Sequence, residues 1–342
     1  MIFKKQQSQR MGVILISIAG ILSHILGVGR DITLSHFFGA GLETDAYGTA
    51  FLFPDLIFNL MIGSTLTGVF LPIFSQKIAR DKQGAEKLAG AFISIVALFS
   101  LLLCAFFYFS LPFLVEVFYS GFSEKKAELT ISLSRILLAS PLLFLLGNFL
   151  GSILLSQKSF FSYAFAPVLY NAGIILGIFF FHEKAGIYAA CYGVVIGLVF
   201  YVLFRFLDFK RLNLRIRLNL DFFRVREVFF LAWPRGVGLF LWQANFWLYS
   251  FLASYLAEGS FAAFNFARNI ETFPVSIFGV SVATASLPFL SDLAAQKNYT
   301  KFSKVLERAI YQILFFAVPA GVGMALLSSD IVDLIFQHGE FN

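Results

Sequence analysis

Long apolar stretches constrain this chain more than any other feature of its sequence. Nine of them are long enough for a membrane helix, which needs about 20 mostly apolar residues. Glycine and proline occur inside these stretches, which is typical of helices and not of the alternating ten-residue strands of a membrane barrel. The sequence therefore predicts an all-α polytopic membrane protein, with spans at 11–30, 46–73, 88–117, 131–155, 160–181, 186–207, 227–256, 263–290 and 309–336.

The composition excludes a soluble domain and gives no sign of a catalytic site. Only 13% of the 342 residues are charged, against about 25% in soluble domains. The first apolar run lacks a small-residue cleavage site, so we interpret it as a retained helix and not as a signal peptide. The two cysteines lie inside apolar runs and the four histidines have no metal-ligand spacing. These observations favour no enzyme activity, no cofactor and no metal ion.

The basic residues predict which ends of the spans face the cytoplasm. With a cytoplasmic N-terminus, 19 of the 26 Lys and Arg fall in inside segments. The outside loops hold only Lys125, Lys126 and Lys184. Such an excess marks the cytoplasmic side of a bacterial membrane. We therefore expect a multi-pass membrane protein with a cytoplasmic N-terminus, and we interpret the net charge of +6 as a sign of topology and not of nucleic-acid binding.

A basic linker separates the sixth and seventh predicted spans. Residues 209–226 read FKRLNLRIRLNLDFFRVR, with apolar residues at alternate positions from 212 to 220. One interpretation is a short extended piece that leads to an interfacial helix. The other is a basic cytoplasmic linker attracted to anionic lipid. We predict a six-helix lobe at 1–208, this amphipathic linker at 209–226, and a partial lobe of three helices at 227–342.

An internal repeat relates the first spans to the last ones. LPIFSQKIAR at 71–80 resembles LPFLSDLAAQ at 287–296, and Gly41 or Gly259 opens the span that ends in each copy. Parallel repeats are typical of transporters, with the substrate site between the two halves. The first copy belongs to a unit of six spans and the second to a unit of three. We therefore expect a fragment, or a protein with an incomplete second lobe.

Charged residues inside spans point to a binding site, because an arginine at the bilayer centre costs about 2.5–3.5 kcal/mol on insertion scales. Arg30, at the end of the first predicted span, either pairs with Asp31 or contacts an anion in a cavity. Arg268 and Glu271 share one helix face, as an internal ion pair or facing a cavity. Arg235 either snorkels to the surface or joins them. A cavity lined by these arginines would suit a phosphate or diphosphate, since the guanidinium donates bidentate hydrogen bonds and keeps its charge.

Seven stretches resemble one family. They are SHILGVGRD at 23–31, FFGAGLETDAY at 37–47, LPIFSQ at 71–76, FAPVLYNAGII at 165–175, LASYLAEGS at 252–260, FPVSIFGVSVATASLPFLS at 273–291 and FQHGEF at 336–341. In this order they resemble the MurJ (MviN) family of lipid II flippases, in the MATE-like exporter superfamily. The resemblance implies fourteen helices in two six-helix lobes plus two further helices, of which this chain covers the first nine. It also implies a central cavity that works by alternating access.

The resemblance further implies which residues line that cavity. The family's arginine at the end of helix 1 matches Arg30, and the acidic residue of the following loop matches Asp45. Two other family arginines fall on His24 and Asn59. In helix 8 the family's arginine and glutamate lie one position beyond the pair found here, and one position turns a helix by about 100°. The predicted headgroup site comprises Arg30, Arg268, Asp45, Glu271, His24, Asn59 and Arg235.

Three functions remain open at this point. The first is a lipid II flippase, and the second is an exporter of another polyprenyl-diphosphate-linked oligosaccharide. The third is a membrane scaffold or remnant without transport activity. A small-cation exporter is disfavoured, because arginines would repel its cargo. The expected partners are a lipid-linked glycan and membrane lipids, the expected state is a monomer, and other polar groups such as Asn171 and Gln243 are expected to form interhelical hydrogen bonds.

Overall fold

The computed structural model describes residues 9–341 except 64, 281, 284–285, 287–289, 291–292 and 295, and these described residues form helices and no strand. The chain divides into two compact units, Met1–Ala262 and Ala263–Asn342. Each unit is described by itself. The second copy of the predicted repeat, at 287–296, lies largely outside the described residues.

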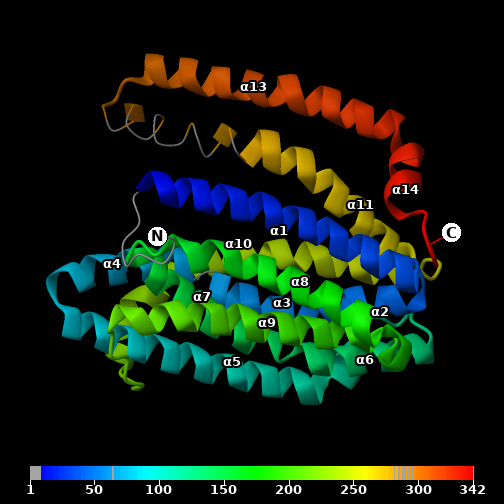
Figure 1. Ribbon diagram of the computed structural model, residues 1–342, viewed down its shortest axis with the longest axis horizontal. Helices are drawn as coiled ribbons and strands as arrows, with labels where there is room; N and C mark the ends of the chain where they lie inside the picture. Colours follow the sequence, from blue (N-terminus) through cyan, green and yellow to red (C-terminus); the bar gives the residue numbers. More distant parts are fainter. Residues whose placement is uncertain are drawn as a thin grey trace. The chain divides into compact units, whose positions relative to one another are not determined.

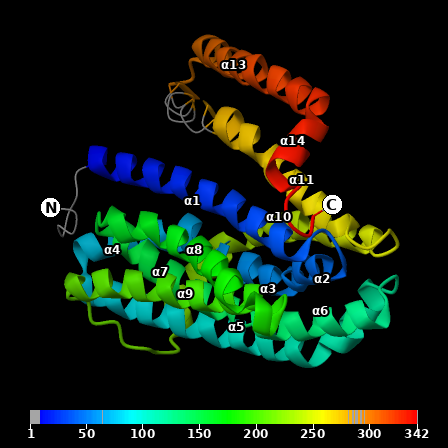
Figure 2. The ribbon, with the colours of Figure 1, turned by 45° about the vertical axis from the view of Figure 1, so that its right-hand side comes forward.

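The first unit is a bundle of long helices that lie side by side (Figures 1 and 2). Its elements are α1 (Gln9–Phe38), α2 (Leu42–Ala50), α3 (Leu52–Ile57), η1 (Phe58–Gly63), η2 (Leu66–Phe70), α4 (Leu71–Arg80), α5 (Lys82–Phe118), α6 (Glu124–Leu137), α7 (Ser140–Ser156), α8 (Phe160–Ala185), α9 (Tyr188–Phe209), η3 (Lys210–Leu212) and α10 (Phe222–Ala253). The helix α11 (Ser260–Pro274) begins at the end of this unit.

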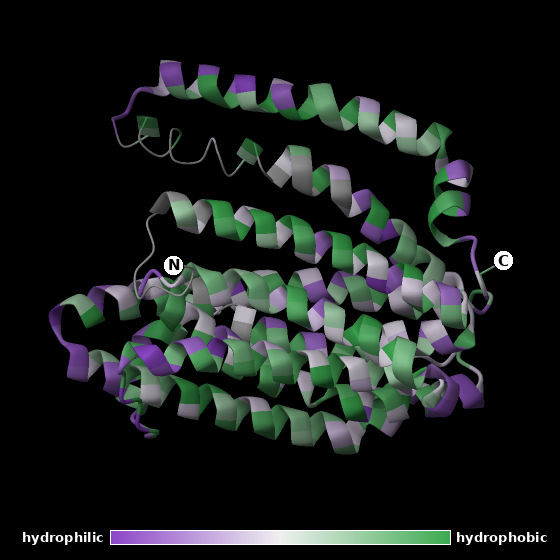
Figure 3. Ribbon diagram, viewed as in Figure 1, coloured by the Kyte–Doolittle hydropathy of each residue, from purple (hydrophilic) through white to green (hydrophobic). Residues whose placement is uncertain are grey.

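Six segments of the described part are long and apolar enough to cross a membrane, namely Ile14–Phe38, Lys82–Phe118, Glu124–Ser156, Phe160–Ala185, Tyr188–Leu212 and Tyr299–Leu326. They confirm a multi-pass all-α membrane protein. Green, hydrophobic residues dominate these helices in Figure 3. Large side chains such as Phe109 and Phe180 are exposed on them, as expected for a surface that faces lipid.

Some predicted spans differ from the helices that form. The first helix continues to Phe38, so Arg30 lies inside it and not at its end. The predicted span 227–256 forms a single helix, α10, which is not among these six segments. In place of one helix at 309–336, α13 ends at Leu326 and α14 follows. Hydropathy marks where a chain enters lipid, whereas helices also continue through polar residues that pair locally.

The predicted span at 46–73 is interrupted. It consists of α2, α3 and two π-helical segments, η1 and η2. Pro54 lies just before η1, and a proline removes a backbone donor and crowds the preceding turn. π-Helical turns inside helices are rare and are frequent at functional sites. The second predicted span is therefore the irregular element of this unit.

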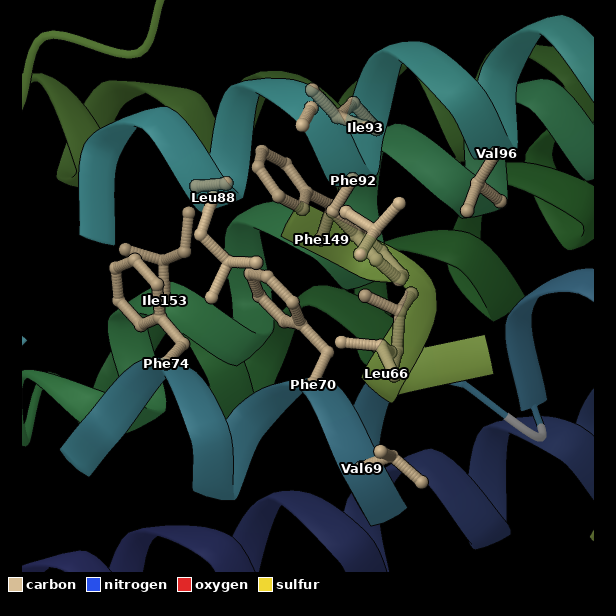
Figure 4. Close-up of a cluster of buried hydrophobic side chains, with 14 of the residues drawn as sticks. Leu66, Val69, Phe70, Phe74, Leu88, Phe92, Ile93, Val96, Phe149 and Ile153 are labelled. Atoms are coloured by element: carbon tan, nitrogen blue, oxygen red, sulfur yellow. The ribbon is translucent and has the colours of Figure 1, made fainter. Parts of the chain in front are cut away.

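The bundle core around this irregular element is aromatic. Phe70, Phe74 and Phe92 are fully buried, and the rings of Phe70 and Phe92 stack with centroids 4.4 Å apart. Phe149 from α7 adds a ring 5.7 Å from that of Phe70. Figure 4 shows these side chains between α5, α7 and the η2–α4 segment. This cluster holds the end of the interrupted span against two long helices.

A buried arginine joins three helices at the end of α9. Arg205 donates to the carbonyl oxygens of Gly147 in α7 and Tyr163 in α8, each at 2.9 Å, and its guanidinium lies over the Tyr201 ring. It is only 2% exposed. Arg205 lies within the predicted span at 186–207, and α9 continues past it to Phe209. Nearby, Asp208 accepts hydrogen bonds from the hydroxyls of Ser159 and Ser162.

The second unit contains the rest of α11, then η4 (Val275–Val280), α13 (Tyr299–Leu326) and α14 (Ser328–Phe336). Phe278 in η4 stacks on Phe316 in α13, with centroids 5.1 Å apart. The rings of Phe266 and Phe336 stack at 5.0 Å. Aromatic contacts therefore join each end of this unit.

The order of elements supports the predicted repeat. A helix begins after Gly41 and again after Gly259, and a π-helical segment begins at Phe58 and again at Val275. The next long helix has an Asx N-cap in both cases, with Asp81 accepting from Gly84 N and Asn298 accepting from Lys301 N. These pairs of features lie 217 or 218 residues apart in the sequence. The two series therefore match in local structure as well as in sequence.

Candidate functional site

Arg30 lies within α1 as a partly exposed cation with one local partner. Its Nε and Nη2 both donate to Asp31 Oδ1, at 3.0 and 2.8 Å. The side chain remains 28% exposed, whereas that of Asp31 is 7% exposed. Tyr47 and Tyr170 are near enough to interact electrostatically with the guanidinium. Asp31 balances the charge of Arg30. The two bonds leave other N–H groups of the guanidinium free of Asp31, so Arg30 keeps donor capacity for an anion.

Asp45 is a fully buried carboxylate with charged and neutral partners. Its Oδ2 accepts from Lys126 Nζ at 2.6 Å and from Gly259 N at 2.8 Å, and its Oδ1 accepts from Ala262 N at 2.7 Å. Two of these donors are backbone groups at the start of α11, where a helix has unpaired N–H groups and a partial positive charge. Asp45 therefore fixes the start of α11 to α2 from a distant part of the sequence.

Lys126 is the residue that sequence reasoning missed. It was expected in an exposed outside loop, but it is only 4% exposed and forms the buried ion pair with Asp45. Its ammonium also lies 4.3 Å from the centre of the Phe122 ring. No local pattern could have distinguished it from Lys125, because its partner is 81 residues away.

Further contacts join the C-terminal ends of α5 and α10. The Ser120 and Tyr255 hydroxyls lie 2.8 Å apart, and Gly121 approaches the Ser254 backbone so closely that a Cβ would not fit. Burial raises the pKa of the adjacent Tyr119 phenol, and a hydrogen bond with Ser250 partly opposes that rise. This end of the first unit is closed by α2, the α5–α6 loop and α10 together.

Asn59 joins the π-helical part of the second span to α10. Its Nδ2 donates to Gln243 Oε1 at 3.0 Å. Gln243 is 4% exposed, and its own amide reaches Leu52 O at 3.5 Å. The predicted interhelical hydrogen bond of Gln243 is confirmed, as is that of Asn171, which donates to Ser23 O at 3.1 Å.

Arg235 reaches from α10 to the second span. It is exposed, but its guanidinium lies against Gly68, where a Cβ would overlap it. Leu239, one turn further along α10, packs in the same way on Gly63. An apolar groove of about 390 Å³ runs beside this contact, lined by Leu60, Met61, Thr65, Phe229, Trp233 and Phe240 among others.

The remaining predicted site residues lie on α1 and α11. His24 is exposed on α1. Arg268 is half-buried and Glu271 is exposed on α11, in the second unit. The Thr272 hydroxyl donates to the Arg268 carbonyl at 2.8 Å. The structure thus groups Asn59 and Arg235 on the same pair of packed elements, and the Arg268–Glu271 pair stays a prediction.

Among the residues that the structure describes, no three His, Cys, Asp or Glu side chains gather as metal ligands would. The polar groups of the first unit are instead an arginine–aspartate pair, a buried lysine–aspartate pair and an amide pair. Of these three pairs, the Arg30–Asp31 pair includes a partly exposed cation, and a guanidinium can bind an anion.

A family model described as lipid II flippase MurJ matches residues 34–342. The chain belongs to the MurJ family. The probable lipid II flippase MurJ of Rickettsia prowazekii (strain Madrid E) is 26% identical over 337 residues, which cover 97% of this chain and 66% of that protein. The one from Bdellovibrio bacteriovorus is 30% identical over 331 residues, covering 94% and 63%. This chain therefore spans slightly less than two thirds of the length of these MurJ relatives.

Solved structures place the fold in the same superfamily. A lipid II flippase MurJ in an inward closed conformation aligns with a TM-score of 0.81 and 28% identity, covering 96% of this chain and 68% of that one. An inward-facing MATE family transporter of the MOP superfamily aligns with a TM-score of 0.72 at 20% identity, over 97% and 77%. The MATE-like helical architecture predicted from the sequence is confirmed.

Proposed function

We propose that this chain is a lipid II flippase, or part of one, that works by alternating access. The observation that carries the proposal is the match to the MurJ family model over residues 34–342. It is supported by Arg30, a partly exposed guanidinium inside an apolar helix. The diphosphate of a polyprenyl-linked glycan is the part of such a substrate that this cation would bind.

The contacts of Asp45 explain why one end of the first unit stays closed. A buried ion pair costs desolvation that is offset only when the geometry is good and hydrogen bonds satisfy the remaining oxygens. Asp45 meets that condition through Lys126, Gly259 and Ala262. Opening this end would separate a carboxylate from several donors at once, so the contacts favour two discrete states over gradual loosening.

Orientation and lobe boundaries belong to the same proposal. The distribution of basic residues supports a bacterial inner-membrane protein with a cytoplasmic N-terminus. The repeated order of elements supports a first lobe at 1–208, a linker at 209–226 and a second lobe that begins at 227. In this arrangement the site would take Arg30, His24 and Asn59 from the first lobe, with Arg235, Arg268 and Glu271 from the second. Asp45 would act beside it by holding the start of α11.

Lipid binding by the purified chain tests the proposal. We expect it to bind lipid II, and we expect Arg30→Gln to weaken binding about tenfold, the usual loss of a charged hydrogen bond. Arg30→Lys keeps the charge without the planar fork and should give an intermediate loss. Arg135→Gln is a matched control, since Arg135 is exposed and lies over the Tyr108 ring. Unchanged binding by a folded Arg30→Gln variant would contradict the site.

The lipid set also separates the alternative substrates. A polyprenyl diphosphate that carries the same disaccharide without the peptide should bind more weakly than lipid II. Equal binding of both lipids would favour an exporter of another lipid-linked oligosaccharide. Failure of the folded chain to bind either lipid would favour a scaffold without transport activity.

A further inference from the structure

The basic linker predicted at 209–226 forms a strap along α5. We use this name for residues 213–221, which adopt no helix or strand between η3 and α10. Contacts pair Asn213 with Lys82, Arg215 with Glu86, Arg217 with Gly90, and Asn219 with Ser94. Two extended residues advance about 6.6 Å and four helical residues about 6 Å. The strap therefore runs parallel to α5 with matched spacing.

Backbone groups carry most of these contacts, which leaves the strap's charged side chains outside. The Lys82 ammonium donates to Asn213 O at 3.1 Å, and Arg215 N donates to Glu86 Oε1 at 3.0 Å. Gly90 leaves no room for a Cβ beneath Arg217 O. Leu214 and Ile216 pack towards the core between these positions. The Arg215 and Arg217 side chains are consequently exposed on the same outer face.

The alternation reverses at Asn219. Its side-chain amide turns towards α5 and donates to Lys87 O at 3.2 Å, while its backbone N–H donates to Ser94 Oγ. The neighbouring Leu218 and Leu220 are thereby forced outwards and are 76% and 66% exposed. Phe223, at the start of α10, is 80% exposed. A run of arginines is thus followed directly by a run of exposed apolar side chains.

Among the described residues, acidic side chains balance only some of the arginines on and beside the strap. Arg224 pairs with Asp221 and Arg211 lies 3.9 Å from Asp208. Arg215 and Arg217 have no ion-pair partner among the described side chains. Figure 3 shows the strap as purple and green residues near the beginning of α5. Contiguous apolar exposure of this kind marks an interaction surface, and the two arginines beside it favour a partner that is anionic.

We propose that the outer face of the strap, made of Arg215, Arg217, Leu218, Leu220, Phe222 and Phe223, binds the headgroup and upper acyl chains of an anionic phospholipid. The arginines contact the phosphate, and the leucine and phenylalanine side chains enter the interface beside it. The bilayer is the occupant that fits, because the strap connects α9 to α10 and both charges on its outer face, Arg215 and Arg217, are positive. The proposal concerns the lipid around the protein, and it stands independently of the transported substrate.

Lipid quenching at a single labelled site tests this proposal with the full chain. Leu218→Cys is labelled with bimane in nanodiscs of phosphatidylcholine with some phosphatidylglycerol; both native cysteines are buried. Quenching is compared for nitroxide-labelled phosphatidylglycerol and nitroxide-labelled phosphatidylcholine. We expect both to quench, with a preference for phosphatidylglycerol that falls at least about fivefold in the Arg215→Gln/Arg217→Gln background.

A double variant at another exposed pair is the matched control. Lys297→Gln/Lys301→Gln removes the same charge from a different polar segment and should leave the preference at position 218 intact. Three results would overturn the proposal. They are a preference that survives in the arginine variant, an equal loss in the lysine variant, or no quenching by either lipid, which would mean that the strap does not contact the bilayer. Labelling at Leu220→Cys repeats the measurement should the first label disturb the strap.

Discussion

Substitutions at Asp45 and Lys126 measure how much their ion pair stabilises the folded protein. Asp45→Asn should lower the thermal stability of the purified protein, because it leaves a buried ammonium without its counter-charge. The expected cost is about 3–5 kcal/mol. Asp45→Asn/Lys126→Met should cost less than the sum of the single changes, as expected for directly coupled groups. Thermal unfolding in detergent measures both effects.

The neighbouring Glu43 provides the control for that pair. It lies on the same first turn of α2 but is exposed. Glu43→Gln should therefore leave the unfolding temperature nearly unchanged. Additive losses in the double variant would mean that Asp45 and Lys126 act separately, contrary to the 2.6 Å contact.

At the scale of whole elements, helices α8 and α9 pack against each other through glycines. Gly173 and Gly177 on α8 face Gly197 and Gly193 on α9, so closely that a Cβ at Gly173 or Gly177 would overlap backbone atoms. Small residues at four-residue spacing let membrane helices approach in this way. Gly177→Leu should separate the two helices and lower thermal stability strongly. Gly238→Leu on α10 is the matched control, since no atom lies within 4 Å of a Cβ there. Equal losses would show that backbone contact is unimportant.

The topology of the whole molecule can be tested by labelling single cysteines in intact cells. The native Cys104 and Cys191 are buried, so a background signal is not expected. Lys184→Cys, in the last turn of α8, should react with a membrane-impermeant maleimide from outside. Lys210→Cys, after α9, should react only once the membrane is opened, since basic segments remain cytoplasmic. The reverse pattern would invert the proposed orientation, and both positions are exposed in the protein.

Several elements could be predicted because their signal is local. The helices α5, α8 and α9 were expected from hydropathy, since each residue's transfer into lipid contributes independently of distant contacts. The extended course of the strap was one of two interpretations of its alternating pattern. The interruption of the second span was not expected, because π-helical turns depend on how η1 and η2 meet α10 and the aromatic core.

The sequence by itself determined that this protein is a helical membrane protein with a repeated order of elements and a basic linker. These features follow from composition and spacing, which report the preference of each segment for lipid or water. Only the tertiary structure decided that Lys126 is buried, that Arg205 joins three helices and that Leu218 is exposed. A charged side chain is well solvated in water, whereas burying it in a protein interior costs desolvation free energy. Whether a charged residue is buried therefore depends on partners far away in the chain.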